Sequence, residues 1–315
     1  MSGREHRDRQ PHRRPPGADR ARRPRGRSER GKLALTGGEA KEFLHGQVTN
    51  DIEALEPGRG CYAAFLTHKG KMRGDLRVLD IGDELFLDTE RVALQDLFNM
   101  IRHYKLGLDV ELHKRTVERA LLSLIGPGAR AVAGDGLGPN EHDNISGEVG
   151  GVPVTFVATD VGVDVICNAE RAGAVKVALG VPEVSEAVAE VVRVERGRPR
   201  YGLDLNDSVI PQEAGLNERA VNFEKGCYVG QETVARLFYR GKPNRHLRGL
   251  RLSEPVASGE PLRLGEREVG RVGSSVLSPA HGPIALAIVR REASPGDTLA
   301  VGDGSATATV VELPF

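Results

Sequence analysis

The change in sequence texture near Arg245 restricts the fold of this chain more than any other feature. From there to the C-terminus, short apolar runs such as 284–289 and 306–313 are separated by turns rich in Gly, Pro and Ser. About six short runs at this spacing are typical of the strands of a small barrel or sandwich. The sequence therefore predicts an all-β domain over residues 245–315.

The chain before Arg245 has a different pattern, in which groups of strands are followed by a helix. The first group has strand-like runs at 33–35, 61–67, 85–87 and 108–112, a strand through Leu76 and Leu79, and a short helix over 38–46. Its main helix is expected over 90–103, where apolar residues recur at helical spacing. These inward-facing residues are Val92, Leu94, Leu97, Phe98 and Ile101.

A similar order recurs further along the chain. Strand-like runs at 119–125, 152–157 and 163–167 come before a helix over 169–179, and the Gly-rich stretch 126–151 is expected to form loops with a short helix near 129–133. Another helix is expected over 185–196, with Val188, Val191 and Val192 inward and Gly197 ending it. Two such groups predict two α+β modules with mainly antiparallel sheets.

The predicted fold class is therefore α+β, with two ferredoxin-like modules followed by a β-barrel. We expect residues 33–116 and 183–244 to form the first module, 117–182 to form the second, and 245–315 to form the barrel. This division follows the texture of the sequence alone.

The first 32 residues form a basic tail with almost no apolar side chains. They contain 12 Lys or Arg and 4 Asp or Glu, so the tail carries +8 and the remaining chain −8. Such a segment cannot bury enough surface to offset its ordering entropy, so we expect residues 1–32 to be disordered. Its charge could attract nucleic acid, but a solvated extension is the favoured interpretation.

Composition excludes several classes of protein. We find no apolar stretch of membrane-spanning length, and Cys61, Cys167 and Cys227 lie far apart in the sequence without a CxxC motif. This pattern argues against a disulfide framework or a closed metal site and favours the cytoplasm. A P-loop, a GxSxG motif and an HExxH motif are missing from the sequence, and we expect no metal.

The sharpest local motif is KGCYVGQE at residues 225–232, which comes directly before a run with helical spacing. Its two glycines allow a sharp turn, and Cys227 is expected near the positive end of the helix dipole and beside Lys225. Both features favour a reactive thiolate. The alternative is a small buried cysteine that packs a tight turn.

This motif is similar to the K-G-C-Y-x-G-Q-E signature of the YgfZ-type folate-binding proteins, which are relatives of the glycine cleavage T-protein. The segments 43–52, 70–78 and 194–216 resemble other parts of that family. The resemblance implies a ring of three domains with tetrahydrofolate in a central channel. It also implies a role in the synthesis or repair of iron–sulfur enzymes and a link to tRNA modification.

The resemblance also implies roles for two carboxylates. Asp75 matches the T-protein carboxylate near the reacting nitrogen of folate, where it could hold or relay a proton, and Gly74 stands where the T-protein has a second Asp. Glu195 matches the residue that accepts two hydrogen bonds from the pterin edge. The alternatives are a polar residue on a strand surface and an exposed charge at a helix end.

Other polar and aromatic residues are weaker candidates for the folate site. Asn50 and Asp51 are expected to brace the channel mouth, Tyr201 and Tyr228 to stack on the ligand, and Lys225 to contact it. A basic cluster follows the signature and could attract the glutamate carboxylates of folate, although a solvated helix face is an equal alternative. It consists of Arg236, Tyr239, Arg240, Lys242 and Arg245.

The leading hypothesis is a tetrahydrofolate-binding accessory protein for iron–sulfur enzymes, with Cys227 and Asp75 as its chemical groups. Its expected partners are folate and iron–sulfur proteins or their assembly machinery. One alternative is a true aminomethyltransferase with T-protein activity, which the retained Asp75 favours and the cysteine signature disfavours. Another is an RNA-binding protein that uses the Arg-rich tail.

Overall fold

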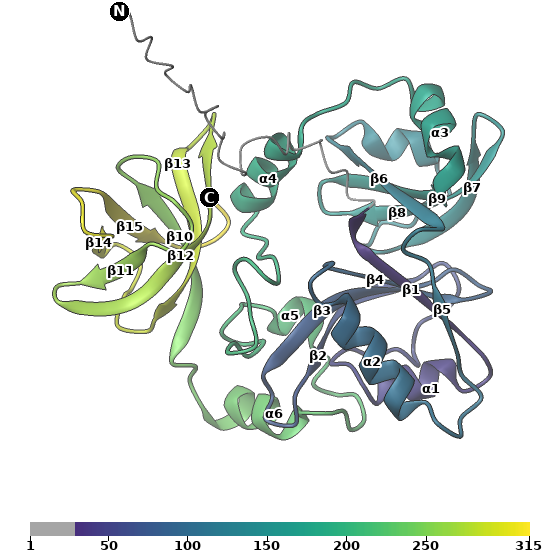
Figure 1. Ribbon diagram of the computed structural model, residues 1–315, viewed down its shortest axis with the longest axis horizontal. Coiled ribbons are helices and arrows are strands. Elements are labelled where there is room, and N and C mark those ends of the chain that lie inside the picture. Colours follow the sequence, from purple (N-terminus) through teal and green to yellow (C-terminus); the bar gives the residue numbers. More distant parts are fainter. Residues whose placement is uncertain (1–28) are drawn as a thin grey trace, which may run out of the picture.

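The computed structural model describes residues 29–315, which form three units around a central region (Figure 1). Two units are antiparallel sheets with helices, and the third is a closed barrel. Both the expected disorder of the tail and the RNA-binding hypothesis concern residues that lie almost wholly outside the described part. The first strand begins earlier than expected, at Gly31, and Lys32 within it is fully buried.

The first unit is a five-stranded antiparallel sheet with the order β2-β3-β4-β1-β5. Its strands are β1 (Gly31–Thr36), β2 (Gly60–Leu66), β3 (Met72–Asp80), β4 (Leu85–Thr89) and β5 (Glu111–Lys114). The helices α1 (Ala40–His45) and α2 (Leu94–Tyr104) belong to the same unit. Side chains alternate across a strand, so β3 turns Leu76 and Val78 to one face of the sheet and Asp75 and Arg77 to the other.

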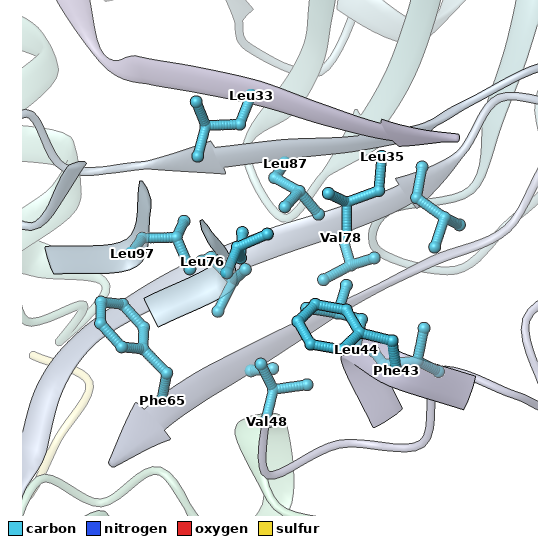
Figure 2. Packing of buried hydrophobic residues seen from close by; sticks show 14 of the residues in the cluster. Leu33, Leu35, Phe43, Leu44, Val48, Phe65, Leu76, Val78, Leu87 and Leu97 are labelled. Carbon is cyan, nitrogen blue, oxygen red and sulfur yellow. The ribbon is translucent and has the colours of Figure 1, made fainter. Parts of the chain in front are cut away.

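The apolar face of this sheet carries the core of the first unit (Figure 2). Phe43 and Leu44 from α1 and Leu97 from α2 pack with Leu76 and Val78 of β3, and all five are buried. Burying apolar surface in this way supplies the main driving force that holds the unit together. The opposite face is thereby left free to present polar side chains of β2 and β3 to the centre of the molecule.

Two boundaries in the first unit differ from the sequence prediction. α2 begins at Leu94, because residues 90–93 form a turn in which the Ala93 amide donates to the Glu90 carbonyl. Val92 therefore lies outside the helix and is 65% exposed, so its predicted inward position is wrong. The last strand also starts later than predicted, at Glu111.

The second unit is a four-stranded antiparallel sheet with the order β6-β9-β8-β7. Its elements are β6 (Arg119–Ile125), β7 (Asn144–Val149), β8 (Val152–Thr159), β9 (Gly162–Asn168), the short helices η2 (Ala129–Ala133) and η3 (Ala169–Arg171), and α3 (Ala172–Leu179). The predicted pair of strands around residue 160 and the short helix at 129–133 are confirmed. The strand β7 lies in a stretch that was expected to form loops.

Helix α4 (Glu186–Glu195) follows the second unit in the chain and packs on the barrel surface. Val194 is fully buried against Leu247, Ile284 and Leu286. Val188, which was predicted to face inward, is 48% exposed, because the buried side of α4 is the one that carries Val194. Gly197 follows the helix with a φ of +65°, a conformation that glycine adopts at low cost after a helix end.

Two further helices, α5 (Asn217–Ala220) and α6 (Gln231–Arg240), pack on the first sheet. The chain then enters a closed barrel with the order β10-β13-β12-β11-β14-β15. Its strands are β10 (Arg245–Leu252), β11 (Pro261–Leu264), β12 (Arg267–Ser278), β13 (Gly282–Arg290), β14 (Thr298–Val301) and β15 (Thr307–Val311). The predicted fold class, an α+β body followed by a β-barrel, is confirmed.

Candidate functional site

A cavity of about 140 Å³ lies where the first sheet, the second unit and the segment around α4 meet. Side chains from β2, β3, the loop before β7, the β8–β9 turn and residues 189–200 line it. The cavity therefore depends on the way the units are brought together, and no single element contains it. Its wall combines a buried carboxylate with an unusual number of arginines.

Asp75 is the buried carboxylate of this cavity and is only 3% exposed. Its Oδ2 accepts a hydrogen bond of 2.7 Å from the hydroxyl of Tyr62 on the neighbouring strand. Burial raises the pKa of Asp75 to about 6, although the Tyr62 hydrogen bond and the charge of Arg30 act in the opposite direction. Burial and Asp75 raise the pKa of Tyr62 in turn, so its hydroxyl stays protonated and keeps donating.

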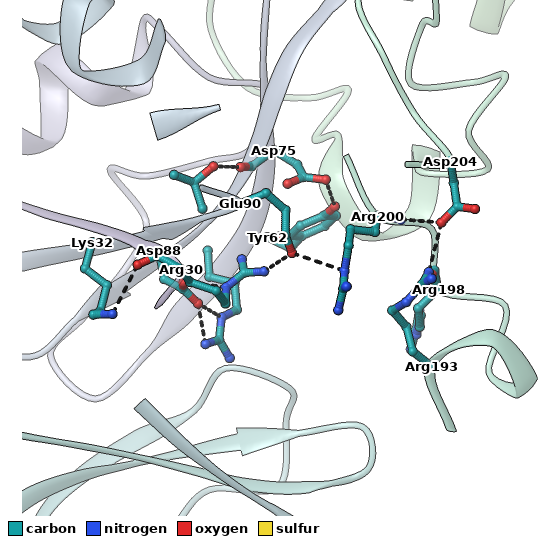
Figure 3. A network of polar contacts seen from close by, with 12 residues as sticks. Arg30, Lys32, Tyr62, Asp75, Asp88, Glu90, Arg193, Arg198, Arg200 and Asp204 are labelled. Carbon is teal, nitrogen blue, oxygen red and sulfur yellow. Dashed lines mark hydrogen bonds and ion pairs between the residues drawn. The ribbon is translucent and has the colours of Figure 1, made fainter. Parts of the chain in front are cut away.

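A network of ion pairs fixes the strand that carries Asp75 (Figure 3). Arg30 donates to Asp88 of β4 over 2.6 Å. Arg77 donates to Asp88 over 2.7 Å and to Asp164 of β9 over 2.6 Å. Burial alone would raise the pKa of Asp88, but the charges of Arg30 and Arg77 outweigh it and lower this pKa to about 2. The network ties β3 and β4 of the first unit to β9 of the second.

Seven arginines and four carboxylates line the cavity. Six of the arginines form ion pairs, among them Arg198 with Asp160 at 2.7 Å and Arg219 with Glu141 at 2.7 Å. Within residues 29–315, the exposed Arg196 has no carboxylate partner. An excess of guanidinium groups on a concave wall attracts anionic ligands.

The sequence-predicted folate contacts occupy different places. Asp75 lines the cavity, and Asn50 supports its wall by donating to the carbonyl of Tyr62 over 2.8 Å. Glu195 is not among the lining residues, and its carboxylate accepts a hydrogen bond of 2.5 Å from Ser278 of the barrel. Tyr201 and Tyr228 pack within the apolar clusters on the first sheet and do not line the cavity either.

The signature loop 225–232 lies outside the cavity lining and against α1. The Lys225 ammonium donates to the carbonyls of His45 and Val48 at the end of α1, and burial lowers its pKa to about 8. This ammonium is therefore bound to main-chain carbonyls, and Lys225, which was expected to contact folate, is not among the residues that line the cavity. Cys227 itself is exposed.

Main-chain geometry explains the glycine that ends this loop. Gly230 has a φ of +86°, and a Cβ atom there would lie 2.5 Å from the Thr67 carbonyl oxygen. Only glycine fits such a position without strain. Tyr228 is buried beside it at 7% exposure, so Cys227 is the residue of KGCY whose side chain reaches the surface without a packing role.

The basic cluster predicted to attract the glutamate carboxylates of folate does not line the cavity. Arg245 pairs with Glu213 at 2.8 Å, and Tyr239 contacts the ring of Phe238 edge-on. The arginines that do line the cavity were not identified from the sequence. Four of them come from the Arg-rich segment 193–200, where the run Arg196-Gly-Arg-Pro-Arg200 was the available signal.

Among residues 29–315, no three His, Cys, Asp or Glu side chains come close enough together to hold a metal ion. In the same range, none of the helices is both long and apolar enough to cross a membrane.

Comparison with known proteins identifies related domains at both ends of the chain. The GCVT N-terminal domain family matches residues 27–145, and the glycine cleavage T-protein C-terminal barrel domain family matches residues 245–315. The barrel match covers the same residues as the closed barrel of the structure.

Several relatives match over nearly the whole chain, and three of them represent the range. A chloroplastic protein of Arabidopsis thaliana named as a transferase is 27% identical over 90% of this chain and 69% of its own length. An aminomethyltransferase of Thermotoga maritima is 28% identical over 91% and 84%. The tRNA-modifying protein YgfZ of Yersinia enterocolitica is 27% identical over 90% and 89%.

A solved structure has the same fold. It is the glycine cleavage system aminomethyltransferase T of Bartonella henselae, with a TM-score of 0.79 and 23% identity over 91% of this chain and 84% of that one. At this identity the likeness establishes the fold and leaves the activity to be argued from the site.

Proposed function

This chain belongs to the glycine cleavage T-protein family of folate-binding proteins, and from that premise we propose that it binds tetrahydrofolate in the central cavity and acts as an accessory protein in the assembly or repair of iron–sulfur enzymes. The observation that carries the proposal is the buried Asp75, held by Tyr62, in a cavity with an excess of arginine. We also propose that the protein acts in the cytoplasm and that its role is linked to tRNA modification.

The residues on the cavity wall fit the chemistry of tetrahydrofolate. A reduced pterin presents N–H donors, and the buried Asp75 offers a carboxylate acceptor for them. The glutamate end of folate carries carboxylates, and Arg196 offers a guanidinium without a partner among the described residues. Glu195 is not included among the proposed contacts, because its carboxylate is engaged with Ser278.

Asp75 is suited to hold or release a proton near the ligand. Tetrahydrofolate, when bound, supplies nitrogens that carry one-carbon units. A carboxyl group with a pKa of about 6 exchanges protons readily at neutral pH, which an ordinary surface Asp does not. The Tyr62 hydroxyl fixes the orientation of this carboxylate.

Cys227 supports the accessory role over ordinary turnover within the cavity. Its thiol is exposed on the signature loop, where a partner protein can reach it, and it is not among the cavity-lining residues. A single thiol is a poor site for an iron–sulfur cluster on its own, so a partner would supply the remaining ligands. We propose that the folate site and the thiol serve different steps.

Aminomethyl transfer is the second candidate function. Several relatives that match over most of the chain are named aminomethyltransferases, and Asp75 occupies the cavity. Incubation of the purified protein with an aminomethylated lipoyl carrier protein and tetrahydrofolate separates the two candidates. Transfer of the one-carbon unit would favour the enzyme, and its absence together with folate binding would favour the accessory protein.

Calorimetric titration of the full chain with tetrahydrofolate tests the proposal directly. We expect saturable binding that Asp75→Asn weakens by about tenfold or more, because it replaces a charged acceptor with a neutral amide. Asp303→Asn is the matched control, since Asp303 lies in a barrel turn with its side chain 96% exposed. No binding by the parent protein would overturn the proposal.

A further inference from the structure

Three aromatic rings form an exposed cluster at the C-terminal half of α6. Phe223 stacks on Phe238 with 3.7 Å between the ring centroids, and Tyr239 contacts Phe238 edge-on at 5.0 Å. Phe238 is 47% and Tyr239 66% exposed, whereas Val234, one turn earlier in the helix, is fully buried. The helix therefore buries its inner side through Val234 and leaves two large rings in contact with water, which is unfavourable unless another surface covers them.

Three cations lie on the same helix or directly after it. Arg236, Arg240 and Lys242 are exposed, and none of them forms an ion pair with an Asp or Glu side chain of residues 29–315. Arg236 and Arg240 are four residues apart and therefore share one face of α6. On the barrel surface, by contrast, Arg263 and Arg267 each lie within 3.3 Å of a carboxylate. The unpaired charge makes this part of α6 complementary to an acidic surface.

These rings and cations form one patch, which we call the aromatic–basic patch. It consists of Phe223, Arg236, Phe238, Tyr239, Arg240 and Lys242, none of which lines the central cavity. The helix α6 lies at the edge of the molecule (Figure 1). Phe223 precedes Cys227 by four residues, so their Cα atoms are at most about 14 Å apart. A protein interface of ordinary size covers about 800 Å² on each partner, so one that is centred on the patch also reaches this thiol.

We propose that the aromatic–basic patch is a docking surface for a partner protein that presents an acidic segment with apolar side chains. The unpaired cations select the acidic partner, and the exposed rings of Phe238 and Tyr239 act as its apolar anchors. The docking surface is separate from the folate site. Only its link to Cys227 rests on the proposed function, in which a partner supplies the remaining ligands of a cluster.

Single-stranded nucleic acid is the other class of negatively charged partner. It binds by stacking its bases on the free faces of aromatic rings. Phe223 and Phe238 each have one face covered by the other, because their planes are only 13° from parallel at 3.7 Å. Rings that pack on one another in this way are typical of the anchors of a protein interface, so the arrangement favours an acidic protein segment.

Fluorescence anisotropy with the full chain and a labelled peptide tests the proposal. The probe is a short peptide in which Asp and Glu alternate with Leu and Trp, and a second peptide carries Asn and Gln in place of the acids. We expect the acidic peptide to bind saturably, at least about tenfold more tightly than the neutral one, and more weakly as salt is added. Equal binding of the two peptides, or no binding of either, would overturn the proposal.

Substitutions at exposed positions locate the binding surface. Because the tail of residues 1–32 is also basic, the decisive comparison is between variants that share it. Tyr239→Ser should weaken binding of the acidic peptide about tenfold, and Arg236→Gln with Arg240→Gln about fivefold. The matched controls are Leu277→Ser, at a barrel residue that is 65% exposed, and the exposed Arg171→Gln. If the patch variants bind as the controls do, the patch is not the docking surface.

Two further titrations separate this proposal from its alternatives. A labelled oligouridine should bind the parent and Tyr239→Ser equally well, and a larger loss for the oligouridine than for the acidic peptide would identify a nucleic-acid site instead. Tyr239→Ser should bind tetrahydrofolate as the parent does, because Tyr239 is not in the cavity lining. Peptide binding by a parent that does not bind tetrahydrofolate would overturn the proposed function and leave the docking surface standing. The reverse result would overturn the docking surface alone.

Discussion

The central cavity and the signature loop are held in place by different kinds of interaction. Behind the cavity wall, charged side chains such as Arg77 and Asp88 are buried and pair with one another. In the signature loop, the contacts are made with main-chain atoms instead. The Lys225 ammonium donates to the carbonyls of His45 and Val48, and Gly230 lies close against the carbonyl of Thr67. The most recognisable motif of the sequence is therefore not part of the ligand cavity.

This difference separates residues that shape the molecule from residues that carry chemistry. In the loop, Lys225, Tyr228 and Gly230 each have a structural cause, and Cys227 remains with an exposed thiol. In the cavity, the buried ion pairs have the structural role, and Asp75 remains as a carboxyl group whose pKa burial raises to about 6. The two regions thus supply separate candidate chemistries, a proton site and a thiol.

The largest expected effect concerns the ion pairs that underlie the cavity. Arg77→Met should lower the free energy of unfolding by about 3–5 kcal/mol, because it leaves Asp88 and Asp164 buried without their shared partner. Urea unfolding measures this loss. Arg267→Met is the matched control and should cost less than about 1 kcal/mol, since the pair of Arg267 with Glu292 is 60% and 39% exposed. Equal effects of the two substitutions would remove the distinction between a buried scaffold and an ordinary surface.

The next effect concerns the three thiols and sharpens the contrast with the loop. Cys227 should react with iodoacetamide at neutral pH at least about 100-fold faster than Cys61 or Cys167. Cys227 is exposed and Cys167 is fully buried, and burial of the partly exposed Cys61 raises the pKa of its thiol to about 12. Mass spectrometry of peptides after timed labelling measures the three rates. Labelling of Cys227 no faster than that of the other two would show that the loop closes over its thiol.

Apolar periodicity was sufficient to predict most of the fold. The barrel, the paired strands β8 and β9 and the helix α3 follow from regular spacing, which depends on local sequence alone. β7 was missed because its residues GEV and NIS include few apolar side chains, so its pairing with β8 is set by the tertiary structure. Val188 has helical spacing, but spacing does not reveal which face of the helix another unit will cover, and Val92 fits the same spacing although the helix begins only at Leu94.

The site was less predictable, because its residues come together only when the units assemble. Asp75, which the resemblance indicated, lines the cavity, and its role is a proposal. The arginines of the cavity read as surface residues in the sequence, since their buried partners lie far away along the chain, as Asp164 does from Arg77. The positive φ of His142, +75°, has no local signature in the sequence, because its loop is held by hydrogen bonds to the carbonyls of Gly58 and Ala158.

A third prediction concerns the free energy of unfolding that the buried carboxylate of Asp75 costs the protein. The pKa of Asp75 is about 6 in the folded protein against 3.8 in the unfolded chain, so ionised Asp75 costs about 3 kcal/mol of stability above pH 6. Because the folded pKa is the higher one, the stability that protonated Asp75 contributes is fully present below pH 3.8 and is lost as the pH rises through 6. Asp75→Asn should therefore be more stable than the parent by about 2–3 kcal/mol at pH 7.5, while its amide oxygen can still accept from Tyr62.

Thermal unfolding between pH 3.5 and pH 7.5 checks this linkage. The advantage of Asp75→Asn should shrink towards zero at the acid end of the range, where Asp75 is protonated in the folded and the unfolded chain. Asp303→Asn should show no such trend, because Asp303 is almost fully exposed. A parent protein as stable as Asp75→Asn at pH 7.5 would mean that the cavity solvates the carboxylate.

The smallest expected effect concerns the exposed side of the cavity, where its chemistry approaches that of a surface. We expect the parent protein to bind tetrahydrofolate with several glutamates more tightly than the form with one, and Arg196→Gln to reduce this gain by about two- to fivefold. Arg196 is exposed and has no carboxylate partner in residues 29–315, so an added carboxylate gains a partner without breaking an existing pair. Salt should reduce the gain, because exposed charges are screened. Arg171→Gln, at an exposed arginine outside the cavity, is the control. If the number of glutamates does not change the affinity of the parent protein, the arginines of the cavity have only a structural role. The ligand chemistry of the cavity would then be limited to Asp75.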